Sequence, residues 1–458
     1  MIKNVVGNPP FMDVAKRGKT QHKLWIDFTK KMFHEILPVD GQLGWVTPSS
    51  FLSPSNKIFN IFKENNTSYI SFDTNEYFKK ENNEPGISMA HYVIEKNANS
   101  KNAKVIKNGE EFEMTIDEQT LYLPNDINKQ SFSIHKKVLL SNRETYKTEC
   151  DYVTCHNVQL TRKKENCPIS KTETAEHIYP IMHTNPQTWY SSIKQECFEK
   201  KKVMWTRSGT TIPFYNDGNL GITDMCYYIE VGSAEEGRIL ASNLNLELFK
   251  YIFKTAKWSG FGNEKIFNMI PVVPGRELTD AEMYDHFGLT KDEITYIEDY
   301  LANKIKKTTT TNWYTDFFHY DESELSEYSK YVRGEDYMGN ITRDMYRIKK
   351  TAEVFTPTDN VLDVLDHMRE SSFSENESFL DPSCGDGQFL SEVVIKKMSF
   401  GHSLEEALST TYGVEIMEDN VKLCKERLAG PNPSDDILAI LDKNIVCADA
   451  INYDYKFD

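Results

Sequence analysis

A short motif near the start of the chain has residue types that could bind an amino group. Asn8, Pro9, Pro10 and Phe11 follow a short apolar segment, NVVG, whose pattern predicts a β-strand. Two prolines cannot continue strand pairing and they restrict the backbone, so the side-chain oxygen of Asn8 and the carbonyl oxygen of Pro9 can point toward one place. Two such acceptors would bind an exocyclic amino group, and the ring of Phe11 offers a face for stacking a planar base. Because the four residues alone are common in simple turns, this interpretation depends on the rest of the sequence.

A second group of candidate ligand-binding residues lies near the other end of the chain, in the stretch DPSCGDGQFL at 381–390. The pattern predicts a strand that breaks into a glycine-rich loop and is followed by a helix. Gly385 and Gly387 permit a tight turn and let backbone amides approach a ligand at the start of that helix. Asp381, at the end of the strand, can hold a cationic amine or a bound water.

Acidic residues also follow the next two expected strands. Glu415 comes after the strand in TYGVE, where a carboxylate could bind both hydroxyls of a ribose, and Asp449 follows the strand in NIVCA, where it could accept from an adenine amino group. Asp381 and Glu415 are further apart than the roughly 20 residues of the dinucleotide-binding pattern, because the intervening sequence predicts one helix and a short extra one. Acidic side chains at three successive strand ends favour a nucleoside cofactor with a positively charged tail over a structural loop with surface acids.

Strands and helices that could position these residues alternate at both ends of the chain. In the first hundred or so residues, strand-like segments surround a helix, LWIDFTKKMFHEIL, that places Leu24, Phe28, Met32 and Ile36 on one face. The alternation resumes at about 345 and continues to the last residue. Strands that alternate with helices indicate a parallel, doubly wound α/β sheet.

The middle of the chain, from about 101 to 275, has a different pattern. Short alternating segments separated by Asn, Gly and Pro predict irregular β structure. One long amphipathic helix is expected from about Arg238 to Lys257, and capping boxes predict two further helices that begin after Thr279 and Thr290. We therefore expect a mixed α+β domain in this region.

The composition is that of a packed globular protein, since 39% of the 458 residues are apolar and 12% are aromatic. No apolar run reaches the ~18 residues needed to cross a bilayer, and the N-terminus lacks the layout of a signal peptide, so we expect a soluble, cytoplasmic protein without a membrane partner. One group of thiols and imidazole, Cys150, Cys155, His156 and Cys167, matches no common zinc spacing. Free structural thiols are therefore favoured, and no metal site is predicted.

The charge distribution is uneven. The net charge of −16 argues at first against nucleic acid, because phosphate binding needs clustered basic residues. Residues 121–270 carry about 19 basic and about 16 acidic side chains, a net charge of about +3, which leaves about −19 on the remainder. Only the middle of the chain leans basic.

Taken together, DPSCGDGQFL, GVEIMED, CADA, NPPF and AEVFTPTDNV resemble the motifs of S-adenosylmethionine-dependent amino-group methyltransferases, in particular the DNA adenine-N6 methylases of restriction-modification systems. The resemblance covers both α/β ends of the chain, and it assigns the cofactor and the target base to separate residues. S-adenosylmethionine would be bound by Phe355, Thr356 and Pro357 at its methionine part, by Asp381, Pro382, Gly385 and Gly387 at its amino acid and the turn, by Glu415 and Ile416 at the ribose, and by Asp449 and Ala450 at the adenine. The target adenine would be received by Asn8, Pro9, Pro10 and Phe11.

The reaction implied by this resemblance is direct methyl transfer to the N6 amino group of an adenine flipped out of duplex DNA. Acceptors at Asn8 and Pro9 would draw the nitrogen toward tetrahedral geometry and stabilise the charge that develops on it, without a general base. Phe11 stands where many relatives have tyrosine, which keeps the stacking face and removes a hydroxyl.

Contacts with the remaining DNA are expected from basic and aromatic residues, partly because GITDMCYY and KWSGFG resemble target recognition domains of large adenine methylases. The predicted DNA contacts are Lys16, Arg17 and Lys19 beside the catalytic motif, and Lys202, Trp205, Arg207 and Trp258 in the middle region. We expect a monomer or a homodimer. No nuclease cluster stands out in the sequence, so any restriction endonuclease is expected to be a separate protein.

Several alternatives stay open from the sequence. Cytosine N4 is also an amino group and is methylated by enzymes with a similar loop, in which serine is commoner than asparagine. RNA adenine methylases and release-factor glutamine methylases share N-P-P but are usually smaller. A non-catalytic DNA-binding specificity partner is disfavoured by the intact cofactor motifs.

The order of the motifs is the second departure from the family. The expected divisions are 1–105 for the catalytic half, 106–310 for the target recognition domain with a helical end, 311–345 for a linker and 346–458 for the cofactor-binding half. In the commonest large relatives the cofactor motifs precede N-P-P-F, whereas here they come last, as in a circular permutation. Both ends would then complete one Rossmann-like sheet, with the recognition domain inserted. The arrangement predicts that the chain ends lie close together and that Asp449 and Asn8 face the same pocket.

Overall fold

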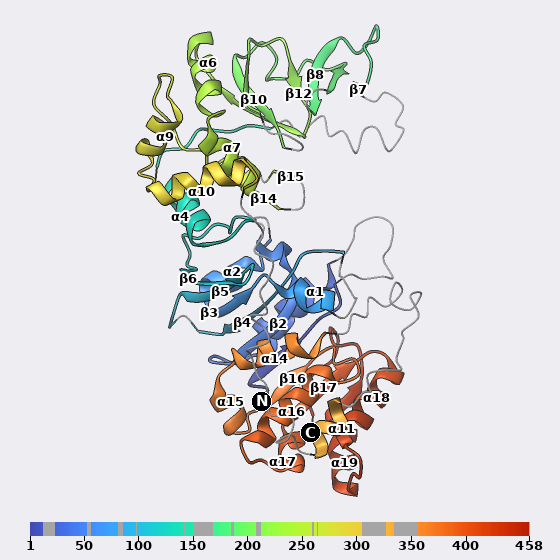
Figure 1. The fold of residues 1–458 in the computed structure, drawn as a ribbon. Coiled ribbons are helices and arrows are strands. Elements are labelled where there is room, and N and C mark those ends of the chain that lie inside the picture. Colours follow the sequence, from blue (N-terminus) through green and yellow to red (C-terminus); the bar gives the residue numbers. More distant parts are fainter. Residues whose placement is uncertain are drawn as a thin grey trace. The chain divides into compact units, whose positions relative to one another are not determined.

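Two compact units make up the chain (Figure 1). The computed structural model describes the whole chain except 12–22, 53–55, 81–85, 98, 142, 151–167, 185–186, 208–211, 259–260, 263, 305–326, 334–355 and 458. The first unit comprises Met1–Phe51, Lys57–Glu118 and Thr308–Asp458, and the second comprises Leu52–Asn56 and Gln119–Lys307. Within the described ranges, no helix combines the length and the apolar character that a membrane span requires.

The first unit is a mixed α/β structure built on a sheet of nine described strands. In their order across the sheet, the strands are β18 (Ile445–Cys447), β17 (Thr411–Glu415), β16 (Phe379–Asp381), β1 (Asn4–Gly7), β2 (Gln42–Pro48), β4 (Met89–Glu95), β3 (Asn66–Ser71), β5 (Asn102–Lys107) and β6 (Glu110–Thr115). From β18 to β2 all neighbours are parallel. Beyond β2 the pairs are antiparallel except for β3 with β5.

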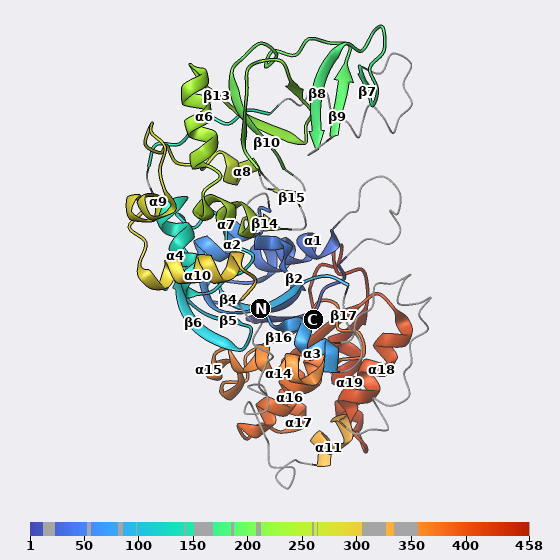
Figure 2. The same ribbon diagram turned by 45° about the horizontal axis from the view of Figure 1, so that its top comes forward.

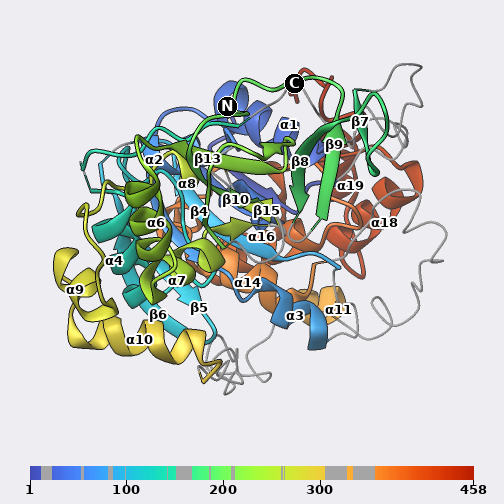
Figure 3. The same cartoon turned by 90° about the horizontal axis from the view of Figure 1, so that it is seen from above.

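Strand β1 lies inside this sheet and joins the two ends of the chain. It pairs with β16 on one side, where Val5 faces Leu380, and with β2 on the other, where Val5 faces Leu43. All four residues of β1 are buried, as expected for an apolar strand with neighbours on both sides. The first residues and the last described residues also lie near one another in all three views (Figures 1 to 3), as the sequence predicts.

Helices cover both faces of the sheet. They are α1 (Leu24–Lys30), the π-helix η2 (Lys31–Ile36), the 3-10 helix η3 (Ser49–Leu52), α2 (Phe59–Glu64), α3 (Thr74–Lys80), α11 (Glu327–Arg333), α14 (Thr358–Asp366), α15 (Glu370–Ser374), α16 (Gln388–Ser399), α17 (Leu404–Ser409), α18 (Glu418–Ala429) and α19 (Asp435–Asn444). On β2, the indole N–H of Trp45 donates to Thr29 of α1, whereas Val46 packs in one cluster with Val364 of α14. Because successive strand residues face opposite sides, α1 and α14 lie on opposite faces (Figure 2). This is the layering that the strand and helix alternation predicts, but the prediction of a parallel sheet is wrong beyond β2, where three of the four strand pairs are antiparallel.

Two segments of the first unit lie in ranges that the sequence analysis assigns to the recognition domain and to the linker. The hairpin β5–β6 continues the sheet beyond residue 105, because its strands pair along their whole length, from Asn102 with Thr115 to Lys107 with Glu110. Helix α11 lies inside the expected linker 311–345 and packs onto the C-terminal half: Tyr328 is buried and donates to the carbonyl oxygen of Leu428.

The second unit combines small sheets with helices. Its strands are β7 (Ile169–Ser170), β8 (Tyr179–Thr184), β9 (Gln187–Ser191), β10 (Lys202–Thr206), β11 (Phe214–Asn216), β12 (Gly221–Ile222), β13 (Cys226–Glu230), β14 (Lys257–Trp258) and β15 (Phe261–Gly262). They form sheets in the orders β11-β10-β13, β12-β8-β9-β7 and β14-β15. The helices are α4 (Lys129–Val138), α6 (Ala234–Asn243), α7 (Glu247–Thr255), α8 (Glu264–Phe267), α9 (Asp280–His286) and α10 (Lys291–Leu301). Helix α10 packs beside α4, as Figure 3 shows.

The single long helix expected from Arg238 to Lys257 is wrong, because α6 and α7 replace it. The chain turns at 244–246, where the side chain of Asn245 donates to the carbonyl oxygen of Pro213. An asparagine that bonds backbone groups outside the helix competes with continued helix formation. The two expected capping boxes are confirmed at the starts of α9 and α10.

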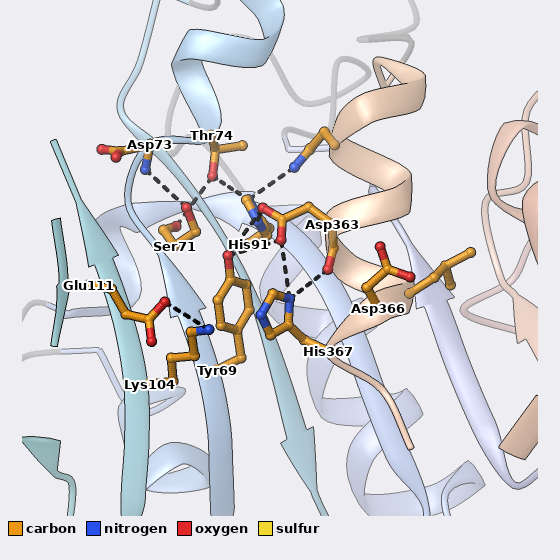
Figure 4. A network of polar contacts seen from close by, with 12 residues as sticks. Tyr69, Ser71, Asp73, Thr74, His91, Lys104, Glu111, Asp363, Asp366 and His367 are labelled. Atoms are coloured by element: carbon orange, nitrogen blue, oxygen red, sulfur yellow. Dashed lines mark hydrogen bonds and ion pairs between the residues drawn. The ribbon is translucent and has the colours of Figure 1, made fainter. Parts of the chain in front are cut away.

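A buried polar network joins α14 to the N-terminal half of the sheet (Figure 4). The carboxylate of Asp363 accepts hydrogen bonds from the hydroxyls of Tyr69 at 3.0 Å and Tyr77 at 2.7 Å, and it pairs with His91 at 2.8 Å and His367 at 3.1 Å. Burial alone would raise the pKa of Asp363, but the attraction of His91 and the hydrogen bonds from both histidines outweigh it and hold the pKa well below its usual range. This carboxylate therefore ties three side chains of the N-terminal half, Tyr69, Tyr77 and His91, to α14, and His367 at the end of the same helix completes its contacts.

We expect Asp363→Asn to lower the free energy of unfolding at pH 7 by about 3 kcal/mol, because the buried histidines and hydroxyls lose a charged acceptor. Tyr77→Phe removes one donor only and should cost about 1 kcal/mol. Urea unfolding followed by tryptophan fluorescence measures both values. Equal small losses in the two variants would show that the carboxylate is not the centre of the network.

Candidate active site

The predicted ligand-binding residues gather at one edge of the large sheet. Strands β18, β17, β16 and β1 are adjacent and parallel, so their carboxyl ends meet at the same edge. Asp449, Glu415, Asp381 and Asn8 lie at or just after these four ends. In chain order these residues are spread over almost the whole sequence.

Asp381 is a buried carboxylate at the end of β16, only 2% exposed. Burial, with a further contribution from the negative charge of Glu415, raises its pKa to about 8 although the amide N–H of Ser383 donates to Oδ1 at 2.9 Å. A carboxyl group with this pKa is largely protonated at neutral pH. A cation placed beside it would restore the ionised form.

Gly7, which the sequence analysis did not single out, packs against this carboxyl group. Its φ of +150° is one that residues with a side chain rarely adopt. A Cβ atom at this position would lie 2.7 Å from Oδ1 of Asp381 and 3.2 Å from Cζ3 of Trp45. Only glycine lets the backbone that leads into Asn8 approach Asp381 so closely. Its signal in the sequence is a glycine between a strand and the N-P-P-F motif.

The residues of the N-P-P-F motif begin directly after β1. The side-chain Nδ2 of Asn8 donates to Oγ1 of Thr356 at 3.1 Å. Pro9 is buried, Pro10 is partly buried, and Phe11 is partly buried and packs against the core cluster that contains Val6. The structure thus brings Asn8 beside one of the predicted cofactor residues, whereas Phe355 lies outside the described residues.

Glu415 and the glycine-rich loop are held together by backbone hydrogen bonds. The amide of Gly385 donates to Oε2 of Glu415 at 3.0 Å, and the amide of Met417 donates to Oε1 at 2.9 Å. Gly385 has a φ of +54°, and a Cβ atom placed on it would meet no atom within 4 Å, so the turn faces open space. Gly387 is the N-cap of α16 with a φ of +89°, and a Cβ atom placed on it would lie 2.9 Å from the sulfur of Cys424. The loop therefore needs glycine at both positions, for conformation at Gly385 and also for packing at Gly387.

Asp449 is exposed beside β18, and in the segment that follows it the hydroxyl of Tyr455 donates to the carbonyl oxygen of Ala450 at 2.8 Å. Its carboxylate accepts from the amide of Ile451 at 3.0 Å and from the side chain of Asn452 at 2.6 Å. Burial raises the pKa of the Tyr455 hydroxyl, and the negative charges of Asp381 and Asp449 add to that rise. Tyr455 was not predicted from the sequence.

Apolar groups next to these acids differ in exposure. Ile416, which follows the buried Glu415, is 66% exposed. Ala450 is buried at 5%, and Pro357 is buried at the start of α14. Pro382 is also buried.

The prediction that Asp449 and Asn8 face one pocket stays a prediction.

Two of the predicted DNA contacts are contradicted by their burial. Lys202 is fully buried in β10, where its amine donates to the carbonyl oxygens of Cys197 at 2.7 Å and Lys200 at 3.1 Å. Trp205 is also fully buried and stacks in the core with Phe253. Both residues lie on the middle strand of the sheet β11-β10-β13, where neighbouring strands and helices cover them. Neither side chain is available to DNA.

The other predicted DNA contacts are not contradicted. Arg207 is partly buried just after β10. Trp258 belongs to β14, with only its backbone described. Lys16, Arg17 and Lys19 lie outside the described residues, as do Cys155, His156 and Cys167 of the thiol group.

We expect the raised pKa of Asp381 to make the free protein less stable as the pH rises from about 4 to 8. In this window the unfolded chain has lost the proton and the folded chain still binds it. Asp381→Asn should therefore raise the free energy of unfolding by about 1–3 kcal/mol at pH 8 and by much less at pH 5. Urea unfolding at both pH values measures the difference. Asp436→Asn, on α19, is the matched exposed control, and a loss of stability in Asp381→Asn that grows with pH would contradict the raised pKa.

Comparisons with known proteins find no relative by sequence, since no family model and no curated protein matches the chain. Partial structural similarity exists to the Type IIL restriction-modification enzyme MmeI in complex with DNA (10% identity, 67% of this chain and 50% of that chain, TM-score 0.30). A DrdV–DNA complex is similar over 66% of this chain and 44% of that chain, with 10% identity and a TM-score of 0.35. A nuclease-deletion mutant of the Type ISP restriction-modification enzyme LlaGI in complex with a DNA substrate mimic is similar over 60% of this chain and 40% of that chain, with 11% identity and a TM-score of 0.32. The chain spans half or less of the length of these proteins. At such TM-scores the similarity assigns neither a fold nor an activity to this chain.

Proposed function

We propose that this protein is a DNA methyltransferase that transfers a methyl group from S-adenosylmethionine to the N6 amino group of an adenine flipped out of duplex DNA. The observation that carries the proposal is the close approach of the two predicted motifs. Gly7, which leads into Asn8, packs against the carboxyl group of Asp381, although the sequence separates these residues by nearly the whole chain. A catalytic amide and a cofactor-binding acid are thus supported by adjacent parallel strands.

The groups at this edge suit S-adenosylmethionine. A cationic amino group beside Asp381 would favour the ionised carboxylate that burial otherwise disfavours. Glu415 would accept from the ribose hydroxyls, Asp449 from the adenine amino group, and the exposed side chain of Ile416 would cover the base. The open space beside Gly385 allows a ligand atom to approach the turn. When bound, the cofactor would supply an electrophilic methyl group on its sulfonium. We assign Phe355, Thr356 and Pro357 to its methionine part.

Residues of the N-P-P-F motif would act on the target base. The Asn8 side-chain oxygen and the Pro9 carbonyl oxygen would accept the two N–H groups of the adenine amino group. These bonds turn the nitrogen lone pair out of the ring and stabilise the positive charge that develops on the nitrogen. Phe11 would stack on the base, which offsets part of the few kcal/mol lost when the base leaves the duplex. The extra N–H proton can then leave to solvent, so no dedicated base is needed.

The second unit would bind the DNA around the target. We propose it as the target recognition domain, inserted between a catalytic half and a cofactor-binding half whose motif order is circularly permuted. Arg207, Trp258 and the basic residues Lys16, Arg17 and Lys19 remain proposed contacts with duplex DNA. A monomer or homodimer that works beside a separate restriction endonuclease fits this organisation.

The test is to incubate the protein with labelled S-adenosylmethionine and unmethylated duplex DNA and to identify the modified nucleoside. We expect label in N6-methyladenine. Label in cytosine would contradict the proposed substrate, and so would label in RNA or in a glutamine-containing protein, offered in parallel reactions, without label in DNA. DNA binding without any transfer would instead support a specificity partner.

Asn8→Ala should reduce methyl transfer by at least about 100-fold, because it removes an acceptor placed at the developing charge. Its affinity for S-adenosylmethionine, measured by calorimetry, should change little. Asn432→Ala is the matched control, since Asn432 also precedes a proline but is exposed in the loop between α18 and α19. Equal activity of the two variants would show that Asn8 is not part of the catalytic site.

A further inference from the structure

We propose that Thr356 is a positioning residue that holds the Asn8 carboxamide in place, with Nδ2 on the Thr356 hydroxyl and the oxygen left for the substrate. This inference rests on the proposed function, in which the oxygen of that carboxamide accepts from the target amino group. It assigns to Thr356 a role beyond its expected place beside the cofactor: the hydroxyl would act on the reaction through Asn8.

The contact itself joins the two halves of the sheet. Oγ1 of Thr356 accepts a hydrogen bond from Nδ2 of Asn8 at 3.1 Å, across 348 positions of sequence. Thr356 is 6% exposed, so little water competes for this bond. A carboxamide is planar and carries its oxygen and nitrogen on opposite sides. With Nδ2 directed to Thr356, Oδ1 is directed away from it, as an acceptor for the amino group requires.

Thr356 is fixed from the side of α14. Pro357 follows it with a restricted φ of −55° and is the N-cap of the helix that begins at Thr358. The Thr358 hydroxyl accepts from the side chain of Gln388 at 2.8 Å, and one turn further along, Asp363 is held by the buried network of tyrosines and histidines. The hydroxyl that holds Asn8 is therefore attached to a helix with little freedom to move.

A defined carboxamide orientation matters because the opposite orientation is unproductive. Rotation of the Asn8 side chain by half a turn would present an NH2 group to the target amino group, and two donors repel each other. A small misplacement of a positioning group can cost about 100-fold in rate. Valine has the shape of threonine without the hydroxyl, so Thr356→Val tests the bond with little change in packing, and Thr356→Ser should restore it.

The first measurement needs neither cofactor nor DNA. In full-length protein labelled with 15N-asparagine, the Asn8 side-chain NH2 signals can be assigned from their loss in Asn8→Asp. Thr356→Val should move the hydrogen-bonded proton upfield and speed its exchange with solvent, and Thr356→Ser should return both toward the wild-type values. Thr115→Val, which removes an exposed hydroxyl on β6 at the far end of the sheet, is the matched control. Unchanged Asn8 signals in Thr356→Val would overturn the proposal.

The second measurement separates positioning from cofactor binding. Thr356→Val should lower kcat at saturating S-adenosylmethionine roughly 10- to 100-fold, beyond any rise in the Kd for S-adenosylmethionine that follows from the loss of its own contact with the cofactor. A higher Kd with an unchanged kcat would make Thr356 a cofactor contact alone and overturn the positioning role. Failure of the proposed function has a different signature: the wild-type protein would methylate no nucleic acid, while the Asn8 signals would still report whether Thr356 holds the carboxamide.

Discussion

Parallel pairing of β1 with β16 is the constraint on which the site depends. Val5 faces Leu380 in this pair, so both strands end at the same edge and Asn8 must emerge beside Asp381. A one-residue slip of β1 would turn the buried side chains of Val5 and Val6 to the opposite faces of the sheet, and core packing therefore fixes the register. Gly7 completes the constraint, because any side chain there would occupy the place of the Asp381 carboxyl group.

The buried acids at the sheet edge lower the stability of the fold, and hydrogen bonds around α14 stabilise it. A buried Asp381 close to Glu415 places two acids where water is excluded, which disfavours folding with both ionised. The neighbouring helix α14 has the opposite character, since Asp363 is satisfied by two hydroxyls and two imidazoles. A rigid hydrogen-bonded network in the same unit as a buried carboxyl group of raised pKa is the pattern expected where a scaffold holds a binding group ready for its ligand.

Local features of this fold could be predicted from the sequence, and contacts between distant segments could not. Strand-to-turn transitions are local, so the glycine-rich loop at Gly385 and the alternation of strands and helices were predictable. The bond between Asn8 and Thr356 depends on which strands become neighbours, and no local pattern encodes it. Lys202 and Trp205 were wrongly predicted to contact DNA because their local pattern is ambiguous. A basic residue near an aromatic one is found in surface grooves, but it also occurs on a central strand where the lysine amine donates to backbone carbonyl oxygens, as Lys202 does.

Side-chain contacts make the two halves of the sheet one structure, independently of the order in which the chain supplies them. Besides the strand pairing, Lys31 of η2 donates to the carbonyl oxygens of Ile451 at 2.6 Å and Tyr453 at 3.0 Å, beside Asp449. On the opposite face of the sheet, the hydroxyl of Tyr69 on β3 donates to Asp363 of α14 and so joins the same two halves. The geometry at the sheet edge is set by these spatial neighbours. A change in the order of the motifs along the chain therefore leaves the edge intact, provided that β1 still lies between β16 and β2.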